Sequence, residues 1–209
     1  MEKGLFITFE GPDGSGKTTV STAVTERLSN EGYKVRYTRE PGGSEIAEEI
    51  RGIILDPKNT EMDVRTEALL YAASRRQHLV EKVLPALEEG ITVISDRFVD
   101  SSLAYQGCGR KIGIEAVYEI NQFAIEGHMP DRTIFLNVDA KVGLERIHRG
   151  RAVLDRLDME SIEFHERVYN GYKEVVSRYQ DRMIVIDANR DVNEVIEDAY
   201  RAVKELLDA

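Results

Sequence analysis

Eight consecutive residues near the start of the chain have the types and spacing of a phosphate-binding loop. They are Gly11-Pro12-Asp13-Gly14-Ser15-Gly16-Lys17-Thr18, which match the pattern G-x-x-x-x-G-K-[ST], and Thr19 follows them. Glycines let backbone N–H groups turn inward around a phosphate chain, and a following helix adds partial positive charge at its N-terminus. Lys17 is expected to contact the β- and γ-phosphates, and the Thr18 hydroxyl to bind Mg²⁺. The motif predicts a site for a nucleoside triphosphate.

The loop has the flanking elements that such a site requires. Residues 5–9 are apolar, β-branched or aromatic, which favours a buried strand. Apolar residues recur at helical spacing between 18 and 30, which favours a helix directly after the loop. The alternative is a glycine-rich turn with an incidental lysine, and the strand–loop–helix order argues against it.

Apolar strands and amphipathic helices alternate along the rest of the chain. Further strands are predicted at 34–38, 91–95, 133–138 and 183–186, and helical segments at 45–55, 63–89 (broken near Pro85), 101–105, 113–126, 141–148, 162–178 and 192–207. Continuous apolar strands separated by helices are typical of a parallel sheet covered on both faces. The sequence therefore predicts one α/β domain over 1–209, with a five-stranded parallel sheet of the P-loop NTPase type and a short lid near 149–157.

Charged residues follow the second and third predicted strands. Ligands of parallel sheets lie beyond the carboxyl ends of the strands, so these residues are expected to converge there. Asp96 is interpreted as a Mg²⁺ partner, with a helix N-cap as the alternative. Arg39, before a Glu-Pro-Gly-Gly turn, and Arg97 are interpreted as phosphate ligands, because arginine binds phosphate oxygens in pairs. The segment from Arg149 to Arg156 is either a mobile lid or an ordinary solvated loop.

These features describe phosphoryl transfer between two anion sites. One is the loop that holds a triphosphate, and the other is an arginine cluster for a second anion. When the acceptor is itself a phosphate, it is ionised near neutral pH and needs no general base. The task of the protein is then to offset the repulsion between two polyanions and to align them.

Composition limits the other functions. The 209 residues carry a net charge of −10, which disfavours a nucleic-acid surface. No apolar run reaches the length of a membrane span, and no signal-peptide pattern is expected, so no membrane partner is predicted. The single cysteine, Cys108, excludes an internal disulfide and suits a cytoplasmic location. The four histidines lack the spacing of zinc ligands.

Three further motifs, in order, make the chain similar to thymidylate kinases of the bacterial type. They are Thr38-Arg39-Glu40-Pro41-Gly42-Gly43, Asp96-Arg97-Phe98 and Ser101-Ser102-Leu103-Ala104-Tyr105-Gln106-Gly107. The resemblance covers essentially the whole chain. It implies transfer of the γ-phosphate of ATP to dTMP with Mg²⁺, which gives ADP and dTDP for dTTP biosynthesis. It also implies a homodimer, for which residues 113–126 are a candidate interface.

The resemblance also implies roles for individual residues. Asp13 would accept a hydrogen bond from the 3′-hydroxyl of dTMP, and Tyr105 would crowd the 2′ position. Tyr71 would stack on thymine, and Arg75 would donate to its O4 edge. The remaining implied contacts are to the dTMP phosphate (Arg39, Arg97, Arg51), to the base (Ser102, Gln106), to Mg²⁺ (Thr18, Asp96) and to ATP (residues 11–19 and Arg149).

Two departures from the family pattern affect these assignments. The stacking position is often phenylalanine in relatives, and the hydroxyl of Tyr71 needs a partner. Some relatives have an arginine within the phosphate loop, where this chain has Gly14 and Ser15. This implies that lid arginines, Arg149, Arg151 and Arg156, supply the catalytic charge. Spacing leaves open which of them meets the transferring phosphate.

Two other functions remain possible from the sequence alone. One is a different nucleoside monophosphate kinase, with UMP or AMP as the acceptor. The other is a nucleotide-driven switch, which needs loops that respond to the γ-phosphate and a positioned water. The Tyr105-Gln106 pair and Arg75 favour a pyrimidine deoxynucleotide over the first alternative, and no segment resembles a switch.

Overall fold

The computed structural model of this chain describes residues 3–150 and 155–209, with the side chains of 148–150 left aside. Within these residues five parallel strands form one sheet, in the order β2-β3-β1-β4-β5. The strands are β1 (Phe6–Glu10), β2 (Val35–Arg39), β3 (Thr92–Asp96), β4 (Arg132–Asn137) and β5 (Met183–Asp187). The predicted five-stranded parallel sheet is confirmed, with strand limits within two residues of those predicted.

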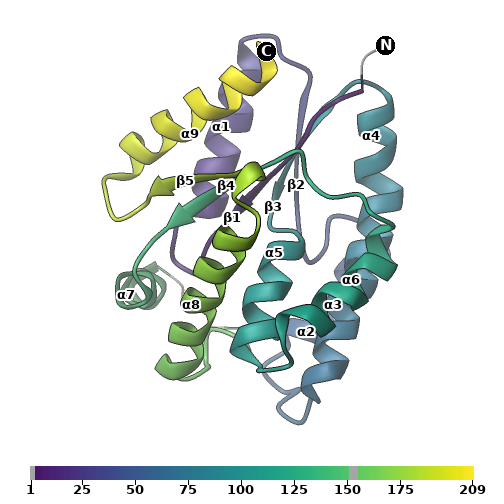
Figure 1. Cartoon of the computed structure of the whole chain (residues 1–209), viewed down its shortest axis with the longest axis vertical. Coiled ribbons are helices and arrows are strands. Elements are labelled where there is room, and N and C mark those ends of the chain that lie inside the picture. The colour runs from purple at the N-terminus through teal and green to yellow at the C-terminus, as the bar shows by residue number, and fades with distance from the viewer. Residues whose placement is uncertain (1–2, 151–154) are drawn as a thin grey trace.

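Helices cover both faces of this sheet (Figure 1). The helices are α1 (Lys17–Asn30), α2 (Glu45–Leu55), α3 (Val64–His78), α4 (Leu84–Glu88), α5 (Val99–Ser102), α6 (Ile114–Ile125), α7 (Ala140–Gly150), α8 (Ile162–Arg178) and α9 (Val192–Leu207). Helices α1 and α9 pack side by side on one face, and α3 to α6 and α8 lie on the other (Figure 1). No helix within the described residues is both long and apolar enough to cross a membrane.

The central strand β1 is buried along its whole length because alternate side chains enter two different cores. Ile7 and Phe9 pack with α1 and α9, whereas Phe6 packs with α3, α4 and α6. A strand covered on both faces needs apolar residues at consecutive positions, as this segment has. This packing places the end of β1, and the loop after it, at the centre of one sheet edge.

The long helical segment predicted over 63–89 is interrupted close to Pro85, as predicted. Helix α3 ends at His78, residues 79–83 form a π-helical turn, and Pro85 lies in the first turn of α4. Proline has no backbone N–H to donate to the helical hydrogen-bond pattern. The wider π-helical turn before Pro85 changes that pattern at the position where the N–H is missing. A second π-helical segment, residues 103–109, follows α5 directly, so the predicted helix at 101–105 is part of a longer helical stretch.

The carboxyl ends of three neighbouring strands meet at one edge of the sheet. Asp96 of β3 is in register with Phe9 of β1 on one side and with Arg39 of β2 on the other. The residues after β1, β2 and β3 therefore converge, as the sequence predicted. This edge carries a cavity with a volume of about 660 Å³.

Candidate functional site

The phosphate-binding loop joins β1 to α1, and its lysine folds back over it. Gly16 has φ 86° directly before α1, a left-handed conformation that glycine adopts without strain. The ammonium group of Lys17 donates to the carbonyl oxygen of Pro12 at 2.8 Å. Burial, together with nearby Arg97, lowers the pKa of Lys17 to about 8. A phosphate group would give this buried ammonium a counter-charge, so the loop suits an anionic ligand.

Helix α7 packs directly against this loop at Gly143, a glycine outside the motif. A Cβ on Gly143 would lie 2.4 Å from the carbonyl oxygen of Asp13. Conversely, a Cβ on Gly14 would lie 2.1 Å from the carbonyl oxygen of Gly143. The two backbones therefore pack together only because both positions lack a side chain. Sequence reasoning missed Gly143, although a glycine inside a predicted helix was a signal.

Thr18 and Asp96 form a small oxygen-rich site beside the loop. The Thr18 hydroxyl donates to Asp96 Oδ2 at 2.5 Å. The other carboxylate oxygen, Asp96 Oδ1, is buried and has no hydrogen-bond partner among the described atoms. One hydroxyl and one carboxylate fit Mg²⁺, which takes few protein ligands and completes its shell with phosphate oxygens and water. Accordingly, the described residues contain no cluster of three or more acidic, histidine or cysteine ligands.

Three arginines from separate elements line the cavity beyond the loop. Arg39, at the end of β2, donates to Glu48 Oε1 at 2.9 Å and to the carbonyl oxygen of Pro41 at 3.1 Å. Arg51 of α2 donates to the same carbonyl oxygen at 2.8 Å. Arg97, directly after β3, is ion-paired to Asp13 at 2.5 Å. The predicted phosphate ligands Arg39, Arg51 and Arg97 are thus brought to one wall.

Arg97 has a strained backbone that its surroundings hold in place. Its φ is +77°, which is uncommon for a residue with a side chain. Its N–H donates to the carbonyl oxygen of Phe9 at 2.9 Å. The next residue, Phe98, donates its N–H to Glu10 Oε1 at 2.7 Å. The turn that aims Arg97 into the cavity is therefore anchored on β1.

Glu10 is the buried carboxylate beneath this turn. Its Oε2 accepts hydrogen bonds from the Ser101 hydroxyl at 2.6 Å and from the Tyr172 hydroxyl at 3.0 Å. Burial, reinforced by the charge of nearby Asp100, raises the pKa of Glu10 to about 7. The sequence analysis did not assign Glu10 a role, although an acidic residue at the end of an apolar strand was visible.

The residues implied for the sugar and the base lie at the other end of the cavity. Tyr71, Arg75, Ser102, Tyr105 and Gln106 all line it. The Tyr105 hydroxyl donates to Asp13 Oδ2 at 2.6 Å, so these two implied sugar-binding residues are in contact. The Gln106 amide donates to Glu67 Oε1 at 2.8 Å. Burial, followed by the charge of Glu67, raises the pKa of the Tyr71 hydroxyl, which therefore stays protonated.

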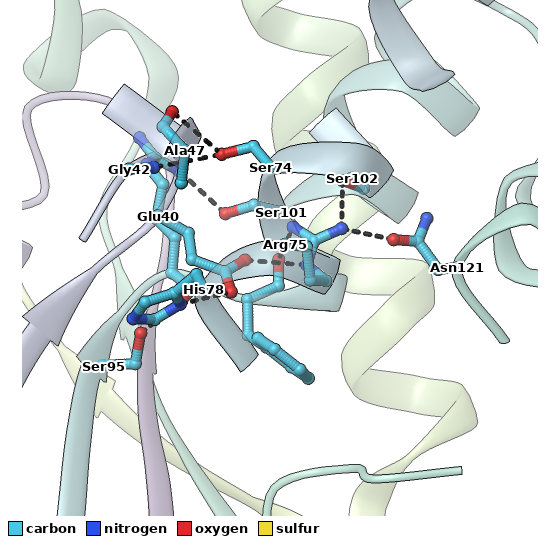
Figure 2. A network of polar contacts seen from close by, with 12 residues as sticks. Glu40, Gly42, Ala47, Ser74, Arg75, His78, Ser95, Ser101, Ser102 and Asn121 are labelled. Carbon is cyan, nitrogen blue, oxygen red and sulfur yellow. Dashed lines mark hydrogen bonds and ion pairs between the residues drawn. The ribbon is translucent and has the colours of Figure 1, made fainter. Parts of the chain in front are cut away.

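Arg75 is held by a network of buried polar groups (Figure 2). Its Nε donates to Glu40 Oε2 at 2.7 Å, and both side chains are only 2% exposed. Figure 2 shows the guanidinium between the Glu40 carboxylate and the Asn121 amide, with His78 against Glu40. Sequence reasoning identified Arg75 but missed its partners Glu40 and Asn121, which are 35 and 46 residues away from it in the chain.

Of the three arginines predicted for the lid, Arg149, Arg151 and Arg156, the structure describes the side chain of Arg156. Arg156 is 8% exposed, and its guanidinium donates to Glu67 Oε2 at 2.6 Å and to the carbonyl oxygen of Ile54 at 2.8 Å. Arg156 does not line the cavity. In this structure its guanidinium, implied by the resemblance to be catalytic, is instead paired with the Glu67 carboxylate. Arg151 and the side chain of Arg149 lie outside the described residues, and their predicted roles stay predictions.

The far wall of the donor side was not anticipated from the sequence. It is formed by the end of α7, the turn after β5 and the start of α9. The Arg146 guanidinium donates to the carbonyl oxygen of Ala188 at 3.0 Å and so links α7 to the β5 turn. Residues of this wall are Arg146, Ile147, Ala188, Arg190, Asp191, Val192 and Val195.

The fold and this site define a class of protein. A parallel sheet, a phosphate-binding loop between β1 and α1, and a carboxylate at the end of the adjacent strand are the features of P-loop NTPases. The continuous cavity adds space for a second anion beside three arginines. The class is thus that of P-loop phosphotransferases.

Comparison with known proteins narrows this class to one family. The family model described as thymidylate kinase matches residues 9–199. A thymidylate kinase of Geobacillus sp. (strain WCH70) is 55% identical over 99% of both chains, and one of Enterococcus faecalis is 57% identical over 97% of both. The crystal structure of the thymidylate kinase from Ehrlichia chaffeensis superposes with a TM-score of 0.79 at 33% identity, covering 97% of this chain and 99% of that one. The chain belongs to the thymidylate kinase family, as its motifs predicted.

Proposed function

We propose that the protein transfers the γ-phosphoryl group of ATP to dTMP and releases ADP and dTDP, a step in dTTP synthesis. The observation that carries this proposal is the single cavity that runs from the phosphate loop to Arg75. It has a donor end at residues 11–19 and an acceptor end at Arg39, Tyr71, Arg97 and Tyr105. Membership of the family supplies the identity of the two substrates.

The arrangement performs the reaction by charge neutralisation and alignment. In this proposal Lys17 contacts the donor phosphates, while Arg39 and Arg97 hold the acceptor phosphate, with Arg51 beside them. The phosphate of dTMP is already ionised, so none of these residues acts as a general base. Because donors fixed before the reaction need no reorganisation, each contributes on the order of 10²–10³ to the rate.

Thr18 and Asp96 are the proposed ligands of Mg²⁺. The buried, unpartnered Asp96 Oδ1 and the adjacent Thr18 hydroxyl support this assignment. When bound, the ion neutralises charge on the donor phosphates. The protein residues orient the carboxylate: Asp96 is the last residue of β3, held in register between β1 and β2.

Asp13 and Tyr105 form the proposed sugar site. The Tyr105 hydroxyl lies 2.6 Å from Asp13 Oδ2, so a carboxylate and an aromatic ring lie side by side. In this proposal the Asp13 carboxylate accepts a hydrogen bond from the 3′-hydroxyl of dTMP. Tyr71 supplies the ring that stacks on the base, and Ser102, Gln106 and Arg75 supply polar groups at its edge. The ring of Tyr105 leaves no room for a 2′-hydroxyl in this proposal.

A lid and a homodimer complete the proposal, with residues 1–209 as a single domain. The lid, near 149–157, brings Arg149 and Arg151 to the transferring phosphate and Arg149 also to ATP. The homodimer is supported by exposed apolar side chains on adjacent helices: Ile46 and Ile53 of α2, Leu69 of α3 and Phe123 of α6, the last 89% exposed. The cytoplasmic location stays a prediction from the sequence.

The test is ADP release with ATP and Mg²⁺, measured with dTMP, dUMP, the ribonucleotide of thymine, dCMP and AMP as acceptors. Fast turnover with dTMP, and its loss with the ribonucleotide, is the expected result. Preference for AMP would contradict the acceptor site while leaving the triphosphate site in place. Turnover without any acceptor would contradict the kinase reaction itself.

A further inference from the structure

The guanidinium of Arg75 is almost completely occupied by protein acceptors. An arginine has five N–H donors in a fixed planar fork. Nε donates to Glu40 Oε2 at 2.7 Å, and one Nη2 donor reaches the carbonyl oxygen of Phe98 at 2.9 Å. Nη1 donates to the Ser102 hydroxyl at 3.0 Å and to Asn121 Oδ1. The described residues therefore bind four donors and leave one, on Nη2, without a protein acceptor.

The acceptors at the two ends of this fork are themselves fixed. The Asn121 amide donates through Nδ2 to the carbonyl oxygen of Val117 at 2.8 Å, which turns its oxygen toward Arg75. On the other side, His78 Nδ1 lies 2.9 Å from Glu40 Oε1, so the carboxylate bridges the two side chains. His78 Nε2 lies 2.6 Å from the hydroxyl of Thr38 on β2. Both ends of the fork are thus tied to separate elements (Figure 2).

Burial makes this arrangement stiff. Arg75 is 2% exposed, Glu40 is 4% exposed, His78 is 0% exposed and Asn121 is 1% exposed. Rotation of the guanidinium would leave buried donors without acceptors, which is costly in a region of low dielectric. The orientation of the remaining Nη2 donor is therefore set in part by two residues that do not line the cavity: Asn121, which contacts Arg75 directly, and His78, which acts through Glu40.

We propose that Asn121 and the Glu40–His78 pair are positioning residues. They hold the Arg75 guanidinium so that it donates one hydrogen bond to a carbonyl oxygen of the base. This inference rests on the proposed function, which places the base at the Arg75 end of the cavity. A single fixed donor accepts a pyrimidine with a carbonyl at position 4, such as uracil or thymine. It rejects cytosine, whose amino group at that position is a donor. Selection among pyrimidines then depends on how firmly Arg75 is held.

The experiment compares dUMP with dCMP, because both lack the methyl group and they differ at the 4-position and the adjacent N3. Dissociation constants are measured by calorimetry for the wild type, Asn121→Leu and Asn121→Asp. Asn121→Leu removes the acceptor while keeping the same branched arrangement of heavy atoms, and Asn121→Asp retains an accepting oxygen. Gln122→Leu is the matched control, since Gln122 lies on the same helix and contacts Met129 rather than Arg75.

In Asn121→Leu the preference for dUMP over dCMP is expected to fall roughly tenfold, the effect of one hydrogen bond to a charged group. Asn121→Asp and Gln122→Leu are expected to keep the wild-type preference, and ATP affinity is expected to be unchanged in all three. A purely structural role would lower the melting temperature and weaken both nucleotides equally. That outcome, or an unchanged preference in Asn121→Leu, would overturn the inference.

A second pair of variants tests the opposite end of the fork if Asn121→Leu does not fold. His78→Asn keeps a donor for Glu40, whereas His78→Leu removes it, so only His78→Leu is expected to lose preference. Equal preference in both would overturn the inference. If the proposed function is wrong, the result differs, because the wild type itself would then neither bind nor phosphorylate dTMP.

Discussion

The donor end and the acceptor end of the cavity are constructed in different ways. The phosphate-binding loop of the donor end is a run of nine consecutive residues, 11–19, and the far wall of that end comes from α7, the turn after β5 and the start of α9. The acceptor end takes side chains from β2, α2, α3 and the segment after β3, and fixes them through partners that are distant in the sequence. A local turn therefore specifies the phosphate-binding loop, whereas the acceptor end exists only when the whole sheet edge has assembled.

The largest effect is expected from the donor end. Lys17→Met removes the only side-chain cation of the phosphate loop, and kcat is expected to fall roughly a thousandfold, with dTMP affinity retained. In the wild type, ATP affinity is expected to fall as pH rises through about 8, because the Lys17 ammonium then loses its proton. Calorimetry from pH 7 to 9 checks this. The exposed Lys34→Met is the control, and an equal pH slope in Lys17→Met would contradict the assignment.

Arg97→Ala tests the acceptor end in the same way. The substitution removes a guanidinium that lines the cavity and is ion-paired to Asp13. Turnover is expected to fall between about a hundredfold and a thousandfold, while ATP binding stays nearly intact. Steady-state kinetics and ATP calorimetry measure the two effects, with the exposed Arg132→Ala as the control. Near-normal turnover would refute Arg97 as a ligand of the acceptor phosphate.

Glu10→Gln tests how the buried carboxylate beneath the Arg97 turn affects stability as the pH changes. The pKa of Glu10 is raised from 4.5 to about 7, so the folded protein binds a proton more tightly than the unfolded chain. Stability supplied by this protonated form is complete below pH 4.5 and is lost as pH rises to about 7. The loss is about 3 kcal/mol.

Urea unfolding between pH 4.5 and 8 measures this dependence. The difference in unfolding free energy between Glu10→Gln and the wild type is expected to grow across this window in favour of the variant. The exposed Glu119→Gln should follow the wild type throughout. Parallel curves for Glu10→Gln and the wild type would show that Glu10 does not titrate there.

Gly143→Ala tests whether the phosphate-binding loop depends on its contact with α7. The added Cβ would lie 2.4 Å from the carbonyl oxygen of Asp13, so α7 must move away from the loop. The expected cost is about 2 kcal/mol of stability, with a rise in the KM for ATP of roughly tenfold and no change for dTMP. Gly52→Ala, another helical glycine, has open space around it and is expected to be neutral or stabilising. Equal behaviour of the two variants would remove the proposed contact.

Much of the fold was predictable because its signals are local. Five apolar segments separated by helical patterns indicated the parallel sheet, and the convergence of Asp96 with Arg39 followed from parallel strand ends. The outcome for Arg156 was not predictable, because an arginine-rich loop has the same pattern whether its side chains are solvated or paired. Its pairing with Glu67 joins residues 89 positions apart.

The sequence by itself determined the phosphate-binding loop and its lysine, because a short motif contains the required backbone turn and its charge. The family motifs also predicted a set of side chains that together line the acceptor end of the cavity. Only the tertiary structure decided how those side chains are held. Arg75 takes Glu40, Ser102 and Asn121 from separations of 35, 27 and 46 residues. Hydrogen bonds between such distant groups depend on packing geometry, to which no local pattern corresponds.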